Sequence, residues 1–403
     1  MEKKSIAIIT AGFTPVPAVN GGAVEKLTTI LVEQNEYEDL YDIDVYTIYD
    51  PKIDSFSYKS TTIVKIKISR IERFIEKNIN RLMRLLKINN NFVRYRRKAY
   101  KEFEKRIRRH SYDYILFENS REMIPMILKA DINNTKLYLH LHNNSSSPSL
   151  NKSIDLCAAN NMAGVIGVSK YIKNDFIAIS GIRPSKVRVL YNCVDSSMSE
   201  NIKERVDSLR KSLYIDNRDF VFLYVGRINY EKGVHVLAKA FSQINTPFTK
   251  LIICGGTWEN EFKDNRYLKT VKKLLGKNLK KTLFVGHIQQ TEIMDYYNLC
   301  NAVVIPSIVQ EAFGMVMLEA SLMGKPCIAT KSGGMTEILS NKNAVWLDIN
   351  KGLSEKISHA MNKMTKDYTP YKAMGERALA EVSNRKEFFD DGYLDRLAEI
   401  ITS

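Results

Sequence analysis

Short apolar runs alternate along the chain with longer segments whose apolar residues recur every three or four positions. The runs are typical of buried strands, and the longer segments are typical of helices packed on a sheet. Their alternation predicts a parallel sheet with helices on both faces, an α/β fold. The predicted strands are Ile6–Thr10, Ile43–Ile48, Ile63–Ile68, Tyr114–Phe117, Leu137–Leu141, Gly164–Val168, Val187–Tyr191, Phe220–Val225, Lys250–Cys254, Thr282–Val285, Ala302–Ile305, Pro326–Ala329 and Ala344–Leu347.

Two such series of strands and helices predict two doubly wound, Rossmann-like domains that face each other across a cleft. The polar stretch Ser196–Asn201 follows the first series and marks the boundary. We therefore expect an N-terminal domain over residues 1–196 and a second domain over residues 197–383. Ligands of open α/β sheets bind at the carboxyl ends of the strands, so polar motifs that directly follow strands are the candidate sites.

The clearest such motif follows the strand Ala302–Ile305. Glu311 lies in the loop, Gly314 opens the next helix, and Glu319 lies roughly two turns further on. The start of a helix presents N–H groups to an oxygen-rich ligand, and two carboxylates can bind neighbouring hydroxyl groups. The motif therefore indicates a sugar or nucleoside site. The alternative is that both glutamates are solvated helix residues.

A second motif follows the strand Phe220–Val225, where Arg227 and Lys232 flank a short loop that ends at Gly233. A planar guanidinium and a compact ammonium group both suit a diphosphate. The alternative is a surface ion pair between Lys232 and either Glu231 or Glu311.

Two weaker signals lie in the first half. Gly21-Gly22 opens a predicted helix and could receive a phosphate, although no GxGxxG fingerprint for a nicotinamide cofactor is present. His142 falls at the carboxyl end of the strand Leu137–Leu141, where it could hydrogen-bond a reacting sugar or acceptor. His140 lies one step back, and we expect it to be packed with its hydrogen bonds satisfied.

Together these motifs resemble the large retaining glycosyltransferase family 4, which has the GT-B fold. The resemblance extends from residue 12 to residue 337. Within the family, Pro15–Gly22 and Glu118–Arg121 are most similar to bacterial enzymes of cell-surface polysaccharide and spore-coat type. Cys193 and Ala312 depart from the usual residues, and neither change removes a polar group. The further matching segments are Val168-Ser169, Asn192–Asp195, Phe284–Gly286, Gly333-Gly334 and Glu337.

The resemblance implies transfer of a hexosyl unit from a nucleotide diphosphate sugar, UDP-linked, to a lipid-linked or growing cell-surface glycan, with retention of configuration. It implies catalytic roles for Glu311, His142, Arg227 and Lys232. Arg227 and Lys232 would bind the diphosphate and stabilise charge on the leaving group. The implied donor-binding residues are Gly22, Arg227, Lys232, Glu311, Phe313, Gly314, Met315 and Glu319, with Glu319 on the ribose, and the implied acceptor-side residues are His142, Asn119 and Arg121.

No cofactor and no metal ion are expected, because the resemblance puts the two cations where a metal would neutralise the diphosphate. No carboxylate is placed as a nucleophile, so we expect attack from the same face, with the donor phosphate taking the acceptor proton. The family also implies that residues 384–403, with a helix at Arg385–Ile401, cross back onto the N-terminal domain. The rival interpretations are a sugar-nucleotide epimerase of the same architecture and a non-catalytic, membrane-associated scaffold.

One metal-binding signature is discounted. Asp42-Ile43-Asp44 matches the DxD pattern of metal-dependent glycosyltransferases of another fold. Here it begins a predicted strand, which places it at the amino end of the sheet and away from the expected site.

The positive charge of the chain is local. The net charge is +15, and the segment Lys65–His110 alone carries 17 Lys or Arg and four Glu. Two basic amphipathic helices are predicted there, over Ile71–Ile88 and from Phe92 to Ile107, and such helices suit an anionic membrane surface. The alternative is a packed pair of helices with solvated basic faces. No nucleic-acid motif accompanies the charge. No apolar stretch reaches transmembrane length, so we expect a cytoplasmic protein, peripheral on the inner face of the cell membrane.

Overall fold

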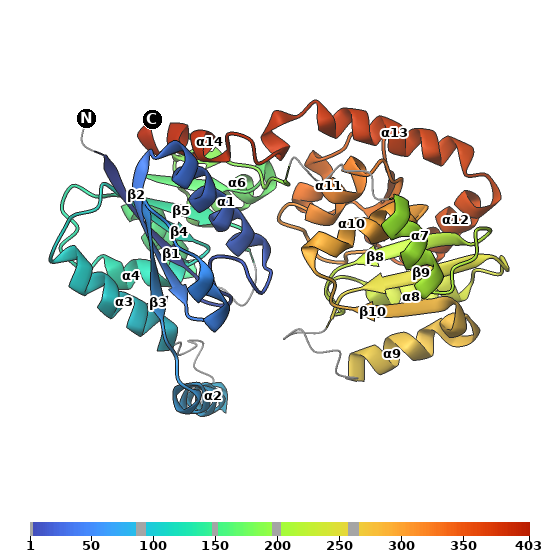
Figure 1. Ribbon diagram of the computed structural model, residues 1–403, viewed down its shortest axis with the longest axis horizontal. Helices are drawn as coiled ribbons and strands as arrows, with labels where there is room; N and C mark the ends of the chain where they lie inside the picture. The colour runs from blue at the N-terminus through green and yellow to red at the C-terminus, as the bar shows by residue number, and fades with distance from the viewer. Residues whose placement is uncertain (1–2, 86–93, 147–151, 196–202, 257–265) are drawn as a thin grey trace. The chain divides into compact units, whose positions relative to one another are not determined.

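The computed structural model describes residues 3–85, 94–146, 152–195, 203–256 and 266–403 (Figure 1). The chain divides into two compact units. Unit 1 comprises Met1–Tyr191 and Gly392–Ser403, and unit 2 comprises Asn192–Asp391. The predicted boundary stretch Ser196–Asn201 lies outside the described residues.

Unit 1 is built on a seven-stranded parallel sheet. Its strands are β1 (Lys4–Thr10), β2 (Tyr41–Ile48), β3 (Thr61–Ile66), β4 (Tyr114–Glu118), β5 (Lys136–Leu141), β6 (Gly164–Gly167) and β7 (Val187–Val189). They are arranged in the order β3-β2-β1-β4-β5-β6-β7. The order reverses between β1 and β4, and this reversal is the switch point of the sheet. Loops that follow β1, β4 and β5 therefore meet where doubly wound folds bind ligands.

The helices of unit 1 surround this sheet, except that α2 lies apart from it and contacts α3. They are α1 (Ala23–Glu38), α2 (Arg70–Leu85), α3 (Arg94–Ile107), α4 (Ile124–Ile127), α5 (Lys152–Asn161), α6 (Lys170–Ser180) and α14 (Tyr393–Thr402). Figure 1 shows α14 beside α1, although the two are far apart in the sequence. The contact is specific, because the Leu394 backbone N–H donates to the Gln34 side chain at 2.7 Å and Tyr138 donates to the Ile401 carbonyl at 2.8 Å.

The predicted helix Arg385–Ile401 is wrong over its first eight residues. A short 3₁₀ turn at Lys386–Phe388 comes first, and the α-helix begins only after Gly392, which has a φ of 64°. Residues up to Asp391 belong to unit 2, where Val194 pairs with Phe389 in an isolated parallel bridge. Only α14 packs on unit 1. Two adjacent aspartates and a left-handed glycine interrupt the helical backbone there.

Unit 2 is built on a six-stranded parallel sheet. Its strands are β8 (Phe220–Val225), β9 (Thr249–Cys254), β10 (Thr282–Gly286), β11 (Ala302–Ile305), β12 (Cys327–Thr330) and β13 (Val345–Leu347). They are arranged in the order β10-β9-β8-β11-β12-β13, so the switch point lies between β8 and β11. The helices are α7 (Lys203–Ser212), α8 (Val234–Ser242), α9 (Arg266–Leu275), α10 (Gln290–Leu299), α11 (Met315–Leu322), α12 (Leu353–Lys366) and α13 (Thr369–Ser383).

The predicted fold class is confirmed, and every predicted strand is present with ends shifted by at most two residues. The strands predicted to end at Ile68 and Tyr191 end at Ile66 and Val189. The central strands are buried on both faces, as their uninterrupted apolar runs require: Val303 is fully buried, and Val304 is 1% exposed. Among the described residues, no helix is both long enough and apolar enough to cross a membrane.

The two predicted amphipathic helices differ in what they do with their apolar faces. In α3, Tyr95, Ala99 and Phe103 are buried in unit 1, and Tyr95 donates a hydrogen bond to the Tyr46 carbonyl at 2.7 Å. The prediction of a membrane-facing apolar stripe is therefore wrong for α3, because that stripe completes the core. In α2, by contrast, the apolar side chains Ile71, Phe74 and Ile75 are exposed. The predicted helix Ile71–Ile88 extends past Leu85 into residues that the structure does not describe.

Candidate active site

In unit 2, the loops after β8 and β11 are in direct contact. The Ile308 backbone N–H donates to the Glu231 carbonyl at 2.9 Å. Gly233 has a φ of 68°, and a Cβ on it would lie 1.9 Å from the Pro306 carbonyl oxygen. Only glycine fits both that conformation and that spacing. The two motifs found separately in the sequence therefore form one site at the switch point.

An ion pair links the two loops. The Lys232 Nζ lies 2.7 Å from each carboxylate oxygen of Glu311. Ser307 also donates its hydroxyl hydrogen to Glu311. The side chains of Lys232 and Glu311 are 26% and 14% exposed. The alternative of a Lys232 ion pair with Glu311 is thus present, and the pair is half-buried and lies at the carboxyl ends of the strands.

The loop after β12 fixes the backbone of Glu311. The Glu311 N–H donates to the Ser332 hydroxyl at 2.8 Å, and the Gly334 N–H donates to the Glu311 carbonyl at 2.9 Å. Ser332 in turn donates to the Val309 carbonyl at 2.6 Å. Glu311 is therefore held by three segments. The segment Gly333-Gly334, which matched the family in the sequence analysis, therefore contacts Glu311 directly.

The loop that carries Arg227 is anchored beneath its side chain. Tyr224, in β8, donates its phenol hydrogen to the Arg227 carbonyl at 2.7 Å. Burial raises the pKa of Tyr224 well above its usual value, so the phenol keeps its proton. The Arg227 side chain is exposed. The Lys232 N–H donates to the Asn229 side chain at 3.0 Å, which shapes the other end of the loop.

The start of α11 supplies the remaining donor-site candidates. The Phe313 side chain is 2% exposed and packs edge-on against Phe388, so only its backbone remains for a ligand. Gly314 caps the helix with a φ of 110° and without a side-chain hydrogen bond, and half-buried Met315 is the first helical residue. Glu319 accepts a hydrogen bond from the buried Tyr297 hydroxyl at 2.7 Å, which orients its carboxylate.

In unit 1, three buried polar side chains meet at the carboxyl ends of β4 and β5. Glu118 is the last residue of β4 and pairs in register with His140 of β5, and His142 follows that strand. The Glu118 Oε1 lies 3.1 Å from the His140 Nδ1, and the Glu118 Oε2 lies 2.8 Å from the His142 Nε2. Sequence reasoning missed Glu118 as a site residue, although its place one strand away from the histidines was a usable signal.

The electrostatics of this trio favour an ionised glutamate beside a neutral histidine. Burial alone would raise the pKa of Glu118, but the charges and hydrogen bonds of the two histidines outweigh it and lower the pKa to about 2. Burial, together with the neighbouring His140, lowers the pKa of His142 to about 4. The nitrogen atoms His140 Nε2 and His142 Nδ1 are buried and have no hydrogen-bond partner in the described part of the chain. The expectation that His140 is fully satisfied is therefore wrong.

The same trio has the residue types of a metal site. One potential ligand atom from each of Glu118, His140 and His142 lies within 4.8 Å of the others, the one such group found among the described residues. The two hydrogen bonds just described already account for these atoms.

The start of α1 differs from the expected open phosphate site. A Cβ on Gly22, which has a φ of 108°, would lie 2.2 Å from a carboxylate oxygen of Glu25. Glu25 is 7% exposed and forms hydrogen bonds with Thr14, and burial raises its pKa. Its carboxylate occupies the favourable end of the helix dipole. A phosphate could approach Gly22 only after this side chain moves, so the Gly22 contact stays a prediction.

The acceptor-side candidates Asn119 and Arg121 have mainly structural partners. Asn119 has a φ of 49°, and its side chain accepts a hydrogen bond from the His142 N–H at 3.4 Å. Arg121 is 3% exposed and donates to Asp155 at 2.7 Å and to Ser145 at 3.0 Å. Arg121 therefore fixes the segments around the site, and direct contact with an acceptor stays a prediction for both residues.

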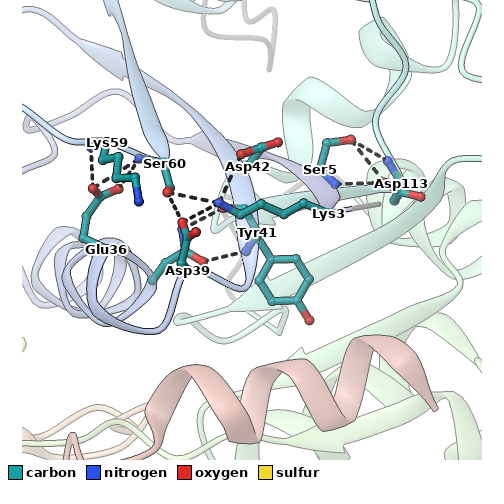
Figure 2. Close-up of polar contacts among 10 residues, drawn as sticks. Lys3, Ser5, Glu36, Asp39, Tyr41, Asp42, Lys59, Ser60 and Asp113 are labelled. Atoms are coloured by element: carbon teal, nitrogen blue, oxygen red, sulfur yellow. Dashed lines mark hydrogen bonds and ion pairs between the residues drawn. The ribbon is translucent and has the colours of Figure 1, made fainter. Parts of the chain in front are cut away.

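The DxD sequence lies at the amino ends of the strands, at the start of β2, as expected. Figure 2 shows the exposed Asp42 beside Lys3, whose Nζ is 3.3 Å away. Asp44 is buried, accepts a hydrogen bond from Tyr112 and forms an ion pair with Arg106 at 2.8 Å. Both aspartates neutralise nearby cations there.

The site and the fold can now be set beside known proteins. Residues 206–380 match the family described as Glycosyl transferases group 1, and residues 67–197 match Glycosyltransferase Family 4. Two parallel-sheet units with polar loops at their switch points, together with these matches, define a glycosyltransferase of the GT-B fold. The chain is a family 4-like glycosyltransferase of this fold.

Individual relatives agree with this assignment. An uncharacterized glycosyltransferase of Methanocaldococcus jannaschii is 31% identical over 188 residues, and the match spans about half of either protein, 45% of this chain and 46% of the relative. The lipopolysaccharide 1,2-N-acetylglucosaminetransferase of Salmonella typhimurium is 26% identical over 68% of this chain and 73% of its own length. The structure of Anabaena HepE in complex with UDP-glucose covers 99% of both chains with a TM-score of 0.74 and 21% identity, which establishes a shared fold.

Proposed function

We propose that this protein transfers a hexosyl unit from a UDP-sugar to a lipid-linked or growing cell-surface glycan, with retention of the anomeric configuration. The observation that carries the proposal is the Lys232–Glu311 pair, which places a cation and a carboxylate together at the switch point of unit 2. Unit 2 is then the donor domain, and unit 1 serves the acceptor. The names of two similar proteins, one bound to UDP-glucose and one an N-acetylglucosaminetransferase, support this donor and acceptor class.

In this mechanism the diphosphate takes Glu311's place on the Lys232 ammonium, which has three donors to share. Arg227 adds a second cation to the leaving group. Glu311 then turns to the hydroxyls of the hexose beside the backbone of Phe313, Gly314 and Met315, and Glu319 holds the ribose hydroxyls.

The bond between the anomeric carbon and the diphosphate oxygen breaks as the acceptor oxygen bonds to that carbon from the same face. The acceptor proton goes to the departing diphosphate, and UDP leaves. The charges of Lys232 and Arg227 favour this step because negative charge grows on the diphosphate in the transition state.

The donor assignment is tested by thermal unfolding with UDP-, GDP-, ADP- and dTDP-sugars in buffer without added metal. A ligand at one hundred times its dissociation constant stabilises the native state by about 2.7 kcal/mol. For a unit of this size we expect the UDP-sugars to raise the unfolding temperature by roughly 5–10 °C. A comparable shift with another nucleotide alone would contradict the UDP assignment. No shift with any of them would contradict the glycosyltransferase mechanism and favour a scaffold.

We also propose that α2 docks the enzyme on an anionic membrane. Its side chains Ile71, Phe74 and Ile75 are 72%, 67% and 36% exposed. Glu72, on another face of the helix, bonds to Lys98 of α3 at 2.8 Å, so the acidic side is turned inward. Figure 1 shows α2 beyond the end of β3, apart from the sheet of unit 1.

The exposed cations of α2 match that surface. Arg70, Arg73, Lys77 and Arg81 are all exposed beside the apolar stripe. An amphipathic helix with this distribution buries its apolar face in the headgroup region and its cations meet anionic lipid.

The docking prediction is tested with Ile71→Ser/Phe74→Ser and vesicles that contain anionic phospholipid. Each lost apolar side chain removes roughly 1.5–3 kcal/mol of burial when fully inserted, so vesicle affinity should fall at least about tenfold. The matched control is Leu156→Ser, because Leu156 is an apolar residue on α5 that is 48% exposed. Equal vesicle binding by the double variant and the control would rule out docking through α2.

A further inference from the structure

Glu118 uses each of its two carboxylate oxygens for a different histidine. Oε1 faces the His140 Nδ1 at 3.1 Å, and Oε2 faces the His142 Nε2 at 2.8 Å. All three side chains are buried, with exposures of at most 4%. The main-chain register between β4 and β5 fixes this arrangement, because Glu118 and His140 are paired residues of adjacent strands.

An ionised carboxylate only accepts hydrogen bonds. Each ring nitrogen that faces Glu118 must therefore carry a proton. A neutral imidazole has one protonated and one bare nitrogen, so the bridge assigns the tautomer of the neutral His142 ring. His142 carries its proton on Nε2, and its Nδ1 is then an acceptor. His140 donates to Glu118 from a protonated Nδ1.

The His142 Nδ1 is buried and has no hydrogen-bond partner among the described residues. Burying a hydrogen-bond acceptor without a donor costs free energy, so we expect a donor to bind this nitrogen. In a neutral ring whose single N–H proton is on Nε2 and is donated to Glu118, the Nδ1 carries no proton and cannot donate a hydrogen bond. It can only receive a hydrogen bond there, and sugar hydroxyls are donors of that kind.

We propose that Glu118 is a positioning residue that holds His142 as the Nε2-protonated tautomer, so that its Nδ1 accepts a hydrogen bond from a hydroxyl of the bound sugar. This inference rests on the proposed function for the identity of the donor hydroxyl. His140 has a supporting part. By engaging Oε1, it keeps the Glu118 carboxylate from rotating, and Oε2 stays directed at His142. His142 therefore binds and orients the sugar and does not act as a general acid.

The tautomers are measured directly by ¹⁵N NMR of histidine-labelled protein at neutral pH. Protonated and bare ring nitrogens differ strongly in ¹⁵N shift. In the wild type we expect the His142 ring to be neutral and protonated on Nε2 and the His140 ring to carry a proton on Nδ1, assigned with His140→Asn and His142→Asn. A His142 ring that is cationic or protonated on Nδ1 would overturn the proposal. This readout requires no activity, so it remains informative even if the UDP-sugar experiment fails.

The variant Glu118→Gln tests the positioning role. A carboxamide offers one acceptor and one donor in place of two acceptors, so only one ring can keep its proton on the bridging nitrogen. We expect one histidine to switch tautomer and kcat for transfer to fall about 10- to 100-fold, with unchanged affinity for UDP. The matched control is Glu122→Gln, since Glu122 forms a partly exposed pair with Arg96 at 3.4 Å. Unchanged tautomers and unchanged kcat in Glu118→Gln would refute the assignment.

One other outcome would also overturn it. If purified protein holds one equivalent of zinc that Glu118→Gln loses, the three atoms are metal ligands and the bridging protons are absent. Elemental analysis of the protein used for NMR, before and after dialysis against a chelator, decides between the two. A metal-free protein with the expected tautomers supports the proposal.

Discussion

Lys232→Ala is expected to lower the rate of hexosyl transfer by about 10²- to 10³-fold and to weaken binding of UDP. The magnitude is typical for the loss of one donor aimed at charge that develops in the transition state. Lys232 is suited to that role because its side chain is only 26% exposed and its ammonium is held by Glu311 at the strand ends, where it is already oriented. The measurements are steady-state transfer kinetics and calorimetric titration with UDP.

The matched control for this variant is Lys239→Ala. Lys239 belongs to α8, the helix that follows the Lys232 loop, and it also pairs with a glutamate, Glu355, at 2.9 Å. Its side chain is 53% exposed, and it lies outside the site. Loss of this lysine should leave both transfer and UDP binding unchanged. Wild-type UDP affinity in Lys232→Ala would contradict the assignment of Lys232 to the diphosphate.

The strands of both units could be predicted from the sequence because strands buried on both faces leave a strong local signal. Runs such as Ala302–Ile305 contain no polar residue, and turn residues bound them. The motifs of unit 2 could be predicted as well, since each directly follows one of these strands. The two motifs form one site only because β8 and β11 are neighbours in the strand order β9-β8-β11. That order cannot be read from the local sequence pattern.

The buried polar partners could not be read from local patterns. Glu118 ends an apolar run, and its importance arises from the strand that pairs with it, so only the register of β4 against β5 reveals the contact with His140. Glu25 is an acidic residue in the first turn of α1, which local pattern alone does not distinguish from a solvated one. Its carboxylate folds back on the start of α1, and the glycine there has no side chain to keep it away.

The helices α2 and α3 show the same limit for amphipathic patterns. Both have an apolar stripe and a basic face, and the sequence alone does not say which stripe is covered. In α3 the stripe contains Tyr95 and Phe103, whose rings fill the core of unit 1. In α2, Ile71, Phe74 and Ile75 stay exposed, while Glu72 on another face of the helix bonds to Lys98 of α3. Periodicity predicts a helix face, and tertiary packing decides what covers it.

Glu311→Gln is expected to abolish measurable transfer, a loss of about 10³-fold or more, while UDP binds as well as to the wild type or more tightly. The two effects separate because Glu311 has two roles in the proposed mechanism. Before the donor binds, its carboxylate competes with the diphosphate for Lys232, at 2.7 Å from each oxygen. Once the donor is bound, the carboxylate hydrogen-bonds to the hexose hydroxyls, and its charge and orientation stabilise the transition state. The measurements are calorimetric titration with UDP and single-turnover transfer of labelled sugar.

A double-mutant cycle with Lys232→Ala and Glu311→Gln decides whether the two residues act as one unit. Lys232→Ala alone leaves Glu311 half-buried without its counter-ion, so it should destabilise unit 2 more than the double variant does. A coupling free energy of about 1–3 kcal/mol in unfolding is expected for contacting residues in one network. The exposed pair Lys239 and Glu355 is the matched control and should show weaker coupling, because solvent screens it. In transfer, the second substitution should add little to the first, since each removes the same charged site. Fully additive losses in both stability and transfer would mean that Lys232 and Glu311 act separately, and the exchange of Lys232 between carboxylate and diphosphate would then be wrong.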